Sequence, residues 1–499
     1  MLGQPKGRPG ELLSTPHLGE WKRRSVLDLA EKRVKRGIPI FNSRFNGALQ
    51  QAWAENPRST RWFRLVVAVS VAVRLAALIA ARHAAMASDA QNYVAMASKL
   101  VSGERFVPYW PPGVALYLAP LVAVGASPLV LRATSLIFWL VACWGLYRLM
   151  KAMGMAGVAW VVLLVFSLLP DAIQMAIEPM TQMPVAALLL VGLSCVAIVL
   201  QRASTAEFLL LGVALGAMSL IRPSALPLLV LLPLACGWVT KRVVPALAGV
   251  LLGLALLGGW MLYARALSGR LMVNTANAVN MFYGNNSETP AYQTWYFGSH
   301  AKVGSDEIDA FPEFAQTLER VEKLPELDRS AEYERVTIAY VRANPGMFVY
   351  RTANRVRAFL GFDVFTSAAL KGVKVLGLPV FLPALAGEAL IYLLIAGTAA
   401  FWMARAPAGF WRDKVNVALL VTMVIYAVPY WISMSHPTYH FPLLLPLAVV
   451  GVSAWRMSDG AAADKWRGWW CVGLLLLVQA EWVWRAAGTA SLGAVKIAP

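Results

Sequence analysis

The sequence is dominated by apolar runs of about 20 residues that alternate with short polar connections. A helix of about 20 apolar residues crosses the hydrocarbon core of a bilayer, so the pattern predicts an all-α polytopic membrane protein. We expect about eleven transmembrane helices, within a range of about ten to thirteen. The apolar run at 113–125 is too short to cross and is expected at the membrane interface. The predicted spans cover residues 62–82, 129–150, 156–170, 180–200, 206–221, 225–240, 243–263, 382–404, 415–433, 441–456 and 468–486.

Long polar stretches divide the chain into four parts. Residues 1–61 form a basic N-terminal extension, and residues 62–263 form a first transmembrane module with an outer loop at 83–128. Residues 264–375 combine Asn, Tyr and short helical patterns, which predicts a small extracytoplasmic cap. Residues 376–499 then hold the last spans.

The outer loop at 83–128 begins with an amphipathic segment. Tyr93 and Met96 belong to a set of apolar residues at helical spacing. The segment is too short and too polar to span the bilayer, so we expect a helix that lies in the interface. Ser88 and Gln91 fit a capping box at its start, and Gly103 fits a stop just past its end.

Composition and charge support a membrane protein and give it an orientation. Only 14% of the residues are charged, against about 25% in soluble domains, which excludes an ordinary soluble enzyme. The net charge is +18, but the N-terminal tail and five alternate connections hold 24 basic and 9 acidic residues, and the rest of the chain holds 21 and 18. Positive charge concentrates on the cytoplasmic side, so the N-terminus is expected in the cytoplasm of a cell (inner) membrane protein. The charge is therefore an orientation signal, and no nucleic-acid partner is expected. All four cysteines fall in apolar runs, which argues against a disulfide framework.

Two charged residues in the first module are candidates for function. Asp89 lies at the start of the interfacial helix, and if Ser88 caps that helix, its carboxylate is available for chemistry. Alternatively, Asp89 is itself the cap or only a favourable charge at a helix start. Arg74 lies within the first span, where a buried charge is costly and a functional role is the default hypothesis. It could instead reach the outer interface or pair with Glu388.

Other candidates are polar or aromatic residues at the outer ends of spans. Tyr109 and Trp110 suit either the membrane interface or a sugar ring. Asp171 and Glu178 lie in a short outer connection, as a second acid for metal or acceptor binding or as plain loop charges. Arg222 is either a functional cation or an ordinary helix-end charge beside a proline.

Several short motifs, taken in order along the chain, resemble the GT-C fold glycosyltransferases that use polyprenyl-phosphate sugars. The most similar groups are the bacterial protein-mannosyltransferase-like and aminoarabinose-transferase-like enzymes. The chain departs from the family where Ser88 and Ala90 flank Asp89 without an acidic neighbour, and where His440 stands in place of arginine. The motifs are Arg74 in a basic first span, Asp89-x-x-x-Tyr93, Pro111-Pro112-Gly113, Glu178-Pro179, Arg222-Pro223, Tyr283-Gly284-Asn285-Asn286 and Tyr439-His440-Phe441-Pro442.

The resemblance implies an enzyme that moves a sugar from a polyprenyl-phosphate-linked donor to a hydroxyl of an envelope glycan, glycolipid or protein acceptor. The transfer takes place on the extracytoplasmic face, with Asp89 as general base. The departures leave open whether Mg²⁺ or Mn²⁺ takes part and which group contacts the phosphate. The residues implied for the donor phosphate and lipid are Arg74, Arg222, His436, Tyr439 and His440, although the two histidines could be interfacial imidazoles. Those implied for substrate are Tyr93, Tyr109, Trp110, Asp171, Glu178, Tyr283 and Asn285.

Three other classes of protein compete with this interpretation. A GT-C type ligase that transfers a whole lipid-linked glycan has the same sequence features. A secondary transporter or flippase often shows internal repeats, which we do not find, and needs no outer segment of this size. A non-catalytic scaffold would leave Asp89 and Arg74 unexplained.

Overall fold

The structure is a computed structural model that describes residues 53, 55–289, 312–370, 372–375, 377–458 and 465–488. The chain divides into two units, residues 1–54 and 55–499, and the helices and strands from Pro57 onward belong to the second. Most of the predicted N-terminal extension 1–61 and a part of the predicted cap, residues 290–311, lie outside the described residues.

Eight helices of the described residues are long and apolar enough to cross a membrane, and the protein is therefore a multi-pass membrane protein. Each of the eight corresponds to a span predicted from the sequence. The first four along the chain are α3 (Pro57–Ala80), α6 (Pro128–Ala152), α9 (Gln182–Arg202) and η2 with α11 (Pro223–Thr240). They are followed by α12 (Val243–Ser268), α19 (Phe381–Arg405), α21 (Lys414–Ile432) and η3 with α22 (Pro437–Ser458).

The expected count of eleven spans is not confirmed. The predicted span 156–170 is a short 3-10 turn, η1 (Ala156–Val158), followed by α7 (Ala159–Ser167). The predicted span 206–221 is α10 (Thr205–Ile221), which is apolar but has only 17 residues. The last prediction, 468–486, corresponds to the 24-residue α23 (Lys465–Gly488), which is not among the eight.

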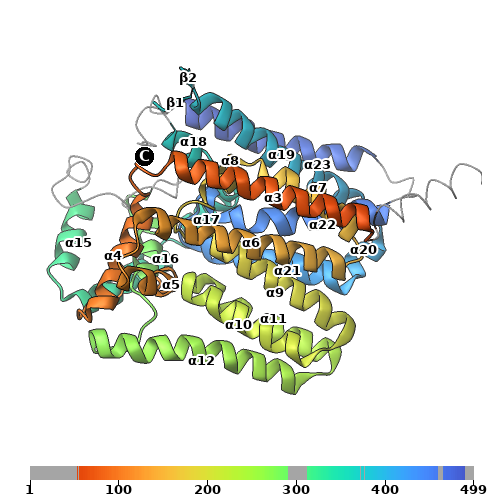
Figure 1. The fold of residues 1–499 in the computed structure, drawn as a ribbon. Helices are drawn as coiled ribbons and strands as arrows, with labels where there is room; N and C mark the ends of the chain where they lie inside the picture. Colours follow the sequence, from red (N-terminus) through yellow and green to blue (C-terminus); the bar gives the residue numbers. More distant parts are fainter. Residues whose placement is uncertain are drawn as a thin grey trace, which may run out of the picture. The chain divides into compact units, whose positions relative to one another are not determined.

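Shorter elements occupy the connections, and several gather at one end of the helices (Figure 1). The apolar run at 113–125 forms α5 (Gly113–Ala123), which is too short to span, as expected. The only strands among the described residues are β1 (Lys374–Val375) and β2 (Leu378–Pro379), which pair antiparallel. The other short helices are α4 (Ser88–Ser102), α8 (Pro170–Gln174), α13 (Ala276–Gly284), α15 (Pro312–Glu322), α16 (Glu326–Ala343), α17 (Pro345–Phe359), α18 (Phe365–Ala369) and α20 (Ala408–Arg412).

Helix α9 lies at the centre of the packing, and 83% of an 18-residue apolar stretch of this helix is buried. It contacts α6, α10, α11 and α21. Nearby, α10 packs closely against α12 because both have glycine at the crossing. A Cβ on Gly212 would overlap the backbone of Gly249. Small residues allow this close backbone approach in membrane proteins.

The expected capping box of α4 is wrong. The helix is preceded by Ala87, which makes no side-chain cap, and Ser88 is its first helical residue. The side chain of Gln91 instead donates to the carbonyl oxygen of Met86 at 2.7 Å. The expected end is confirmed, since Gly103 adopts the left-handed conformation with φ of 70°. Tyr93 is buried on the inner face of the helix, as its spacing predicts.

Candidate functional site

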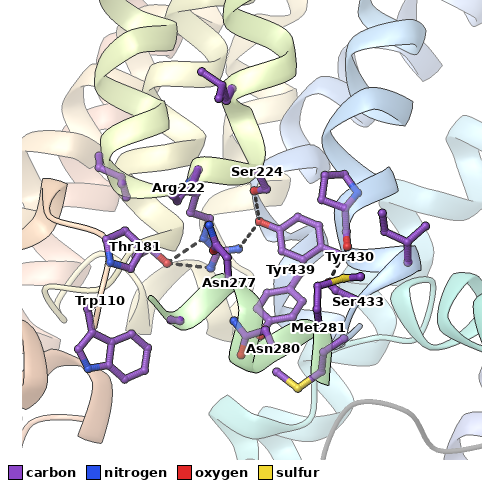
Figure 2. A pocket seen from close by; sticks show the side chains of 18 of the residues that line it. Trp110, Thr181, Arg222, Ser224, Asn277, Asn280, Met281, Tyr430, Ser433 and Tyr439 are labelled. Carbon is purple, nitrogen blue, oxygen red and sulfur yellow. Dashed lines mark hydrogen bonds between the residues drawn. The ribbon is translucent and has the colours of Figure 1, made fainter. Parts of the chain in front are cut away.

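A cavity of about 450 Å³ lies where the start of α4, the turn after α10, α13, the end of α21 and η3 meet (Figure 2). Its volume is in the range of small-molecule sites. Five residues selected from the sequence line it: Asp89, Tyr93, Trp110, Arg222 and Tyr439. Lining residues that were not expected from the sequence include Thr181, Ser224, Asn277, Asn280, Met281, Tyr430 and Ser433.

Asp89 reaches the cavity from the first turn of α4. A carboxylate is favourable there because the N-terminus of a helix carries partial positive charge. Tyr93 follows one turn later on the same side and is also a lining residue. Burial, and then the charge of Asp89, raise the pKa of Tyr93 and of Tyr109. Both phenols therefore stay protonated at neutral pH and can donate hydrogen bonds.

Arg222 reaches the cavity because Pro223 follows it. A residue before proline is disfavoured in the helical region, and Arg222 has φ of −139° and ψ of 102°, which ends α10. Its side chain is largely buried, with 8% exposed. The guanidinium donates to Thr181 Oγ1 at 2.7 and 2.9 Å and to the Tyr430 hydroxyl at 3.0 Å (Figure 2).

The positive charge of Arg222 is surrounded by hydroxyl groups and aromatic rings. The guanidinium lies 5.1 Å from the ring centre of Tyr439, which is stacked on Tyr430 at 4.6 Å. The Tyr430 hydroxyl also pairs with Ser224 at 2.9 Å. Within the described part of the chain, no carboxylate forms an ion pair with Arg222. A buried cation with neutral partners is suited to bind an anionic ligand.

Arg74 does not line the cavity. It is fully buried, and its guanidinium donates to the carbonyl oxygens of Ser70 and Ala172 at 3.1 Å. It also lies 3.5 Å from the ring centre of Trp139. Its side chain is thus not exposed, and no ion pair with Glu388 is formed. These contacts fasten α3 to α8 and α6, which indicates a structural role.

Glu178 also lies away from the cavity lining. It forms a buried ion pair with Arg132 at 3.0 Å. Arg132 in turn donates to the carbonyl oxygens of Ala84 and Ala85 at 3.0 and 2.9 Å. The pair therefore holds the segment before α4 against α6. Burial raises the pKa of Glu178, although the charge of Arg132 opposes that shift.

Asp171 is buried and does not line the cavity. Its carboxylate accepts a hydrogen bond from Thr366 at 2.7 Å, and its backbone N–H donates to Glu388 at 3.0 Å. Burial and the nearby Asp363 raise its pKa well above the ordinary value. Asp171 and Glu178 thus do not provide a pair of carboxylates to the cavity. Among the described residues, no group of three or more His, Cys, Asp or Glu side chains is arranged to hold a metal ion.

Three of the remaining selected residues lie outside the cavity lining. Tyr109 packs edge-on against Trp110, with ring centres 5.1 Å apart. Asn285 is buried and donates to a carbonyl oxygen of α21 at 3.1 Å. His436 accepts the backbone N–H of Thr438 at 3.0 Å and so caps η3, and burial lowers its pKa to about 3.

The last two selected residues are His440 and Tyr283. The ring of His440 is hydrogen-bonded at Nδ1 to the carbonyl oxygen of Phe359 at 2.7 Å. Tyr283 packs against the apolar cluster between α13, α15 and α16. Neither is among the residues that line the cavity.

The sequence contained a signal for some of the lining residues that were not selected, but not for all. Asn277 and Asn280 are three residues apart, which places them on one helical face once α13 is recognised. Tyr430 follows Pro429 near the end of a predicted span. Thr181 has no distinguishing pattern, because its role depends on the position of Arg222.

Comparison with known protein families gives no match for this sequence, and comparison with curated protein sequences gives none either.

Proposed function

We propose that the protein is an integral-membrane glycosyltransferase that moves a sugar from a polyprenyl-phosphate donor to an acceptor hydroxyl. The observation that carries the proposal is that Asp89 and Arg222 line the same cavity. One is a carboxylate that can accept a proton, and the other is a buried cation without a carboxylate partner among the described residues. Glycosyl transfer from a lipid phosphate needs both groups near one bound sugar.

In the proposed reaction, the oxygen of the acceptor hydroxyl attacks the anomeric carbon of the sugar. The bond between that carbon and the phosphate oxygen breaks, and its electron pair leaves with the lipid phosphate. Asp89 accepts the hydroxyl proton as the new bond forms. Arg222 stabilises the negative charge that develops on the phosphate. Thr181 and Tyr430 hold the guanidinium in place for this task.

The proposal includes a topology. In this topology, α7, α10 and α23 cross the membrane with the eight longer helices, which gives eleven spans. The N-terminus is on the cytoplasmic side. Helices α4, α13 and α17 then lie on the extracytoplasmic side, together with the cavity. The distribution of Lys and Arg in the sequence supports this orientation.

The described lining residues do not supply the two carboxylates of the metal site considered from the sequence. A site of that kind would use two carboxylates with the phosphate, and Asp89 is the one carboxylate among the described lining residues. We therefore assign no step of the reaction to Mg²⁺ or Mn²⁺.

The test is transfer of radiolabelled sugar by the purified protein in lipid vesicles, with a panel of polyprenyl-phosphate sugars and acceptors. We expect Asp89→Asn to lower the rate by at least about 100-fold, because it removes the base. Asp328→Asn is the matched control, since Asp328 is an exposed carboxylate paired with Arg270 at 2.9 Å.

Each outcome separates the alternatives. Equal transfer by wild type and Asp89→Asn would remove Asp89 as base. Label that never leaves the lipid with any donor would contradict glycosyl transfer. Transfer from lipid-linked oligosaccharides alone would favour the ligase.

A further inference from the structure

Helix α13 separates the cavity from the apolar core of the cap and presents a different face to each. The cavity face includes two amide side chains, and the opposite face is packed among apolar residues. The lining residues on α13 are Ala276, Asn277, Asn280 and Met281. The apolar cluster contains Val279, Phe282, Leu318, Val321 and Tyr333.

The start of α13 is fastened to the segment that carries Trp110. The backbone N–H groups of Thr275 and Ala276 donate to the carbonyl oxygens of Pro108 and Tyr109 at 3.0 and 3.1 Å. The aromatic wall of the cavity and the amide wall are therefore joined by main-chain hydrogen bonds.

The end of α13 is fastened to the end of α21. A Cβ on Gly284 would overlap the carbonyl oxygen of Ser433, so only glycine allows this approach. Arg355 is fully buried and donates to the carbonyl oxygens of Gly284 and, at 3.2 Å, Ile432. Asn285 donates to the same Ile432 oxygen at 3.1 Å. Because both ends of α13 are held, Asn277 and Asn280 are positioned before a ligand binds.

The charges of the cavity restrict the sugar that it can hold. Asp89 and Arg222 are the charged groups among the described lining residues, and the proposed reaction uses both. The described lining residues offer no third charged group to an ammonium or carboxylate on the sugar, and burial of such a group without a counter-ion is costly. A hydroxyl group has no such cost, and an amide side chain can both donate to it and accept from it.

We propose that Asn277 and Asn280 form a subsite for the hydroxyl groups of an uncharged sugar, with the ring of Trp110 against the sugar face. Figure 2 shows both amides on one helix, with Trp110 toward one end and Ser433 toward the other. The inference rests on the proposed glycosyl transfer, because it names the class of sugar that the donor carries.

The test measures equilibrium binding of radiolabelled lipids to the full chain in lipid nanodiscs. The lipids are polyprenyl phosphates that carry a neutral hexose, an amino sugar, a uronic acid or no sugar. We expect wild type to bind the neutral-sugar lipid about tenfold more tightly than the two charged-sugar lipids. Asn277→Ala and Asn280→Ala should each weaken neutral-sugar binding about tenfold, the effect of one lost hydrogen bond. Neither should change binding of the sugar-free lipid, which a general loss of structure would reduce.

Two further variants complete the design. Asn92→Ala, at an exposed asparagine of α4, is the matched control and should bind all four lipids like wild type. Asn280→Asp adds a carboxylate and should shift the preference toward the amino sugar.

The outcomes distinguish this inference from the proposed function. Unchanged neutral-sugar affinity in both alanine variants, equal binding of charged sugars by wild type, or no shift in Asn280→Asp would overturn the subsite. Selective binding without sugar transfer would retain the subsite and remove the proposed chemistry. Failure of wild type to bind any of the lipids would remove both.

Discussion

At the scale of single residues, arginines that look alike in the sequence differ in what their side chains bind. Arg222 donates to hydroxyl groups of the cavity wall, whereas Arg74 donates to main-chain carbonyl oxygens. Both are cations in or beside predicted spans, and the resemblance assigned both to the lipid phosphate. Only their surroundings in the fold distinguish the two roles. The sequence does not show these surroundings, because the partners of Arg74 include a carbonyl oxygen 98 residues further along the chain. The sequence could therefore suggest which arginines matter, but not what each does.

The burial of His436 leads to a prediction about how stability depends on pH. Burial lowers the pKa of His436 to about 3, whereas an unfolded histidine titrates near 6.5. Between these values the unfolded state binds the extra proton, so stability falls as the pH decreases. We expect the unfolding free energy of wild type, relative to His436→Asn, to fall by about 2 kcal/mol from pH 6.5 to pH 5. Asparagine is a suitable replacement because its side chain can also cap η3.

The comparison with His436→Asn separates the effect of the histidine from that of buried carboxyl groups, which change stability with pH in the opposite direction. Burial raises the pKa of Asp171 and Glu178. Their contributions to the unfolding free energy therefore decrease as the pH rises above the ordinary pKa of a carboxyl group. These contributions are common to both proteins and cancel in the difference. Parallel stability curves, measured by thermal unfolding at each pH, would show that His436 is not buried in its neutral form.

At the scale of elements, features set by the local sequence could be predicted, and features set by tertiary contacts could not. The buried face and the end of α4 follow from the spacing of Tyr93 and from Gly103. The start of α4 was predicted incorrectly, because Ser88 lies one position inside the helix that it was expected to cap. Helix α13 was not predicted as an element. Its nine residues are too few to show a long apolar periodicity, and contacts from distant residues such as Arg355 hold it.

Two arginines on α17 provide a matched test of how α13 is held. Arg355 bridges α13 to α21, whereas Arg351, one turn earlier and equally buried, donates to the carbonyl oxygen of Asn286 at 2.9 Å. Lysine keeps the charge but cannot reach several carbonyl oxygens at once. We expect Arg355→Lys to lower kcat/KM for sugar transfer about tenfold or more and to speed amide hydrogen exchange in residues 276–284 and 430–434.

Arg351→Lys is the control for loss of a buried arginine as such. It should speed exchange near residues 286–289 and leave kcat/KM within about twofold of wild type. Equal losses of activity in the two variants, with equal changes of the unfolding midpoint, would show that Arg355 contributes only general stability.

At the scale of the whole molecule, the sequence predicted the class of fold well and the number of spans less well. Apolar runs of at least 18 residues are a strong signal, and the eight predicted spans with such helices are present. The predicted number of spans was least certain where a helix is shorter than 18 residues. The span at 206–221 ends because Arg222 precedes a proline, and that interruption is also what directs the guanidinium into the cavity. The irregularity that made the span hard to count thus belongs to the candidate site.

The distribution of Lys and Arg predicts which side of the membrane the cavity faces. Ser98 on α4 and Ala408 on α20 are both exposed, at elements predicted on opposite sides. In a variant without the four native cysteines, we expect Ser98→Cys to react with a membrane-impermeant maleimide on intact cells. Ala408→Cys should react only after permeabilisation, because moving the basic tail and connections across the bilayer is unfavourable. The reverse pattern would place Asp89 and Arg222 toward the cytoplasm, so donor and acceptor would have to be supplied from that side.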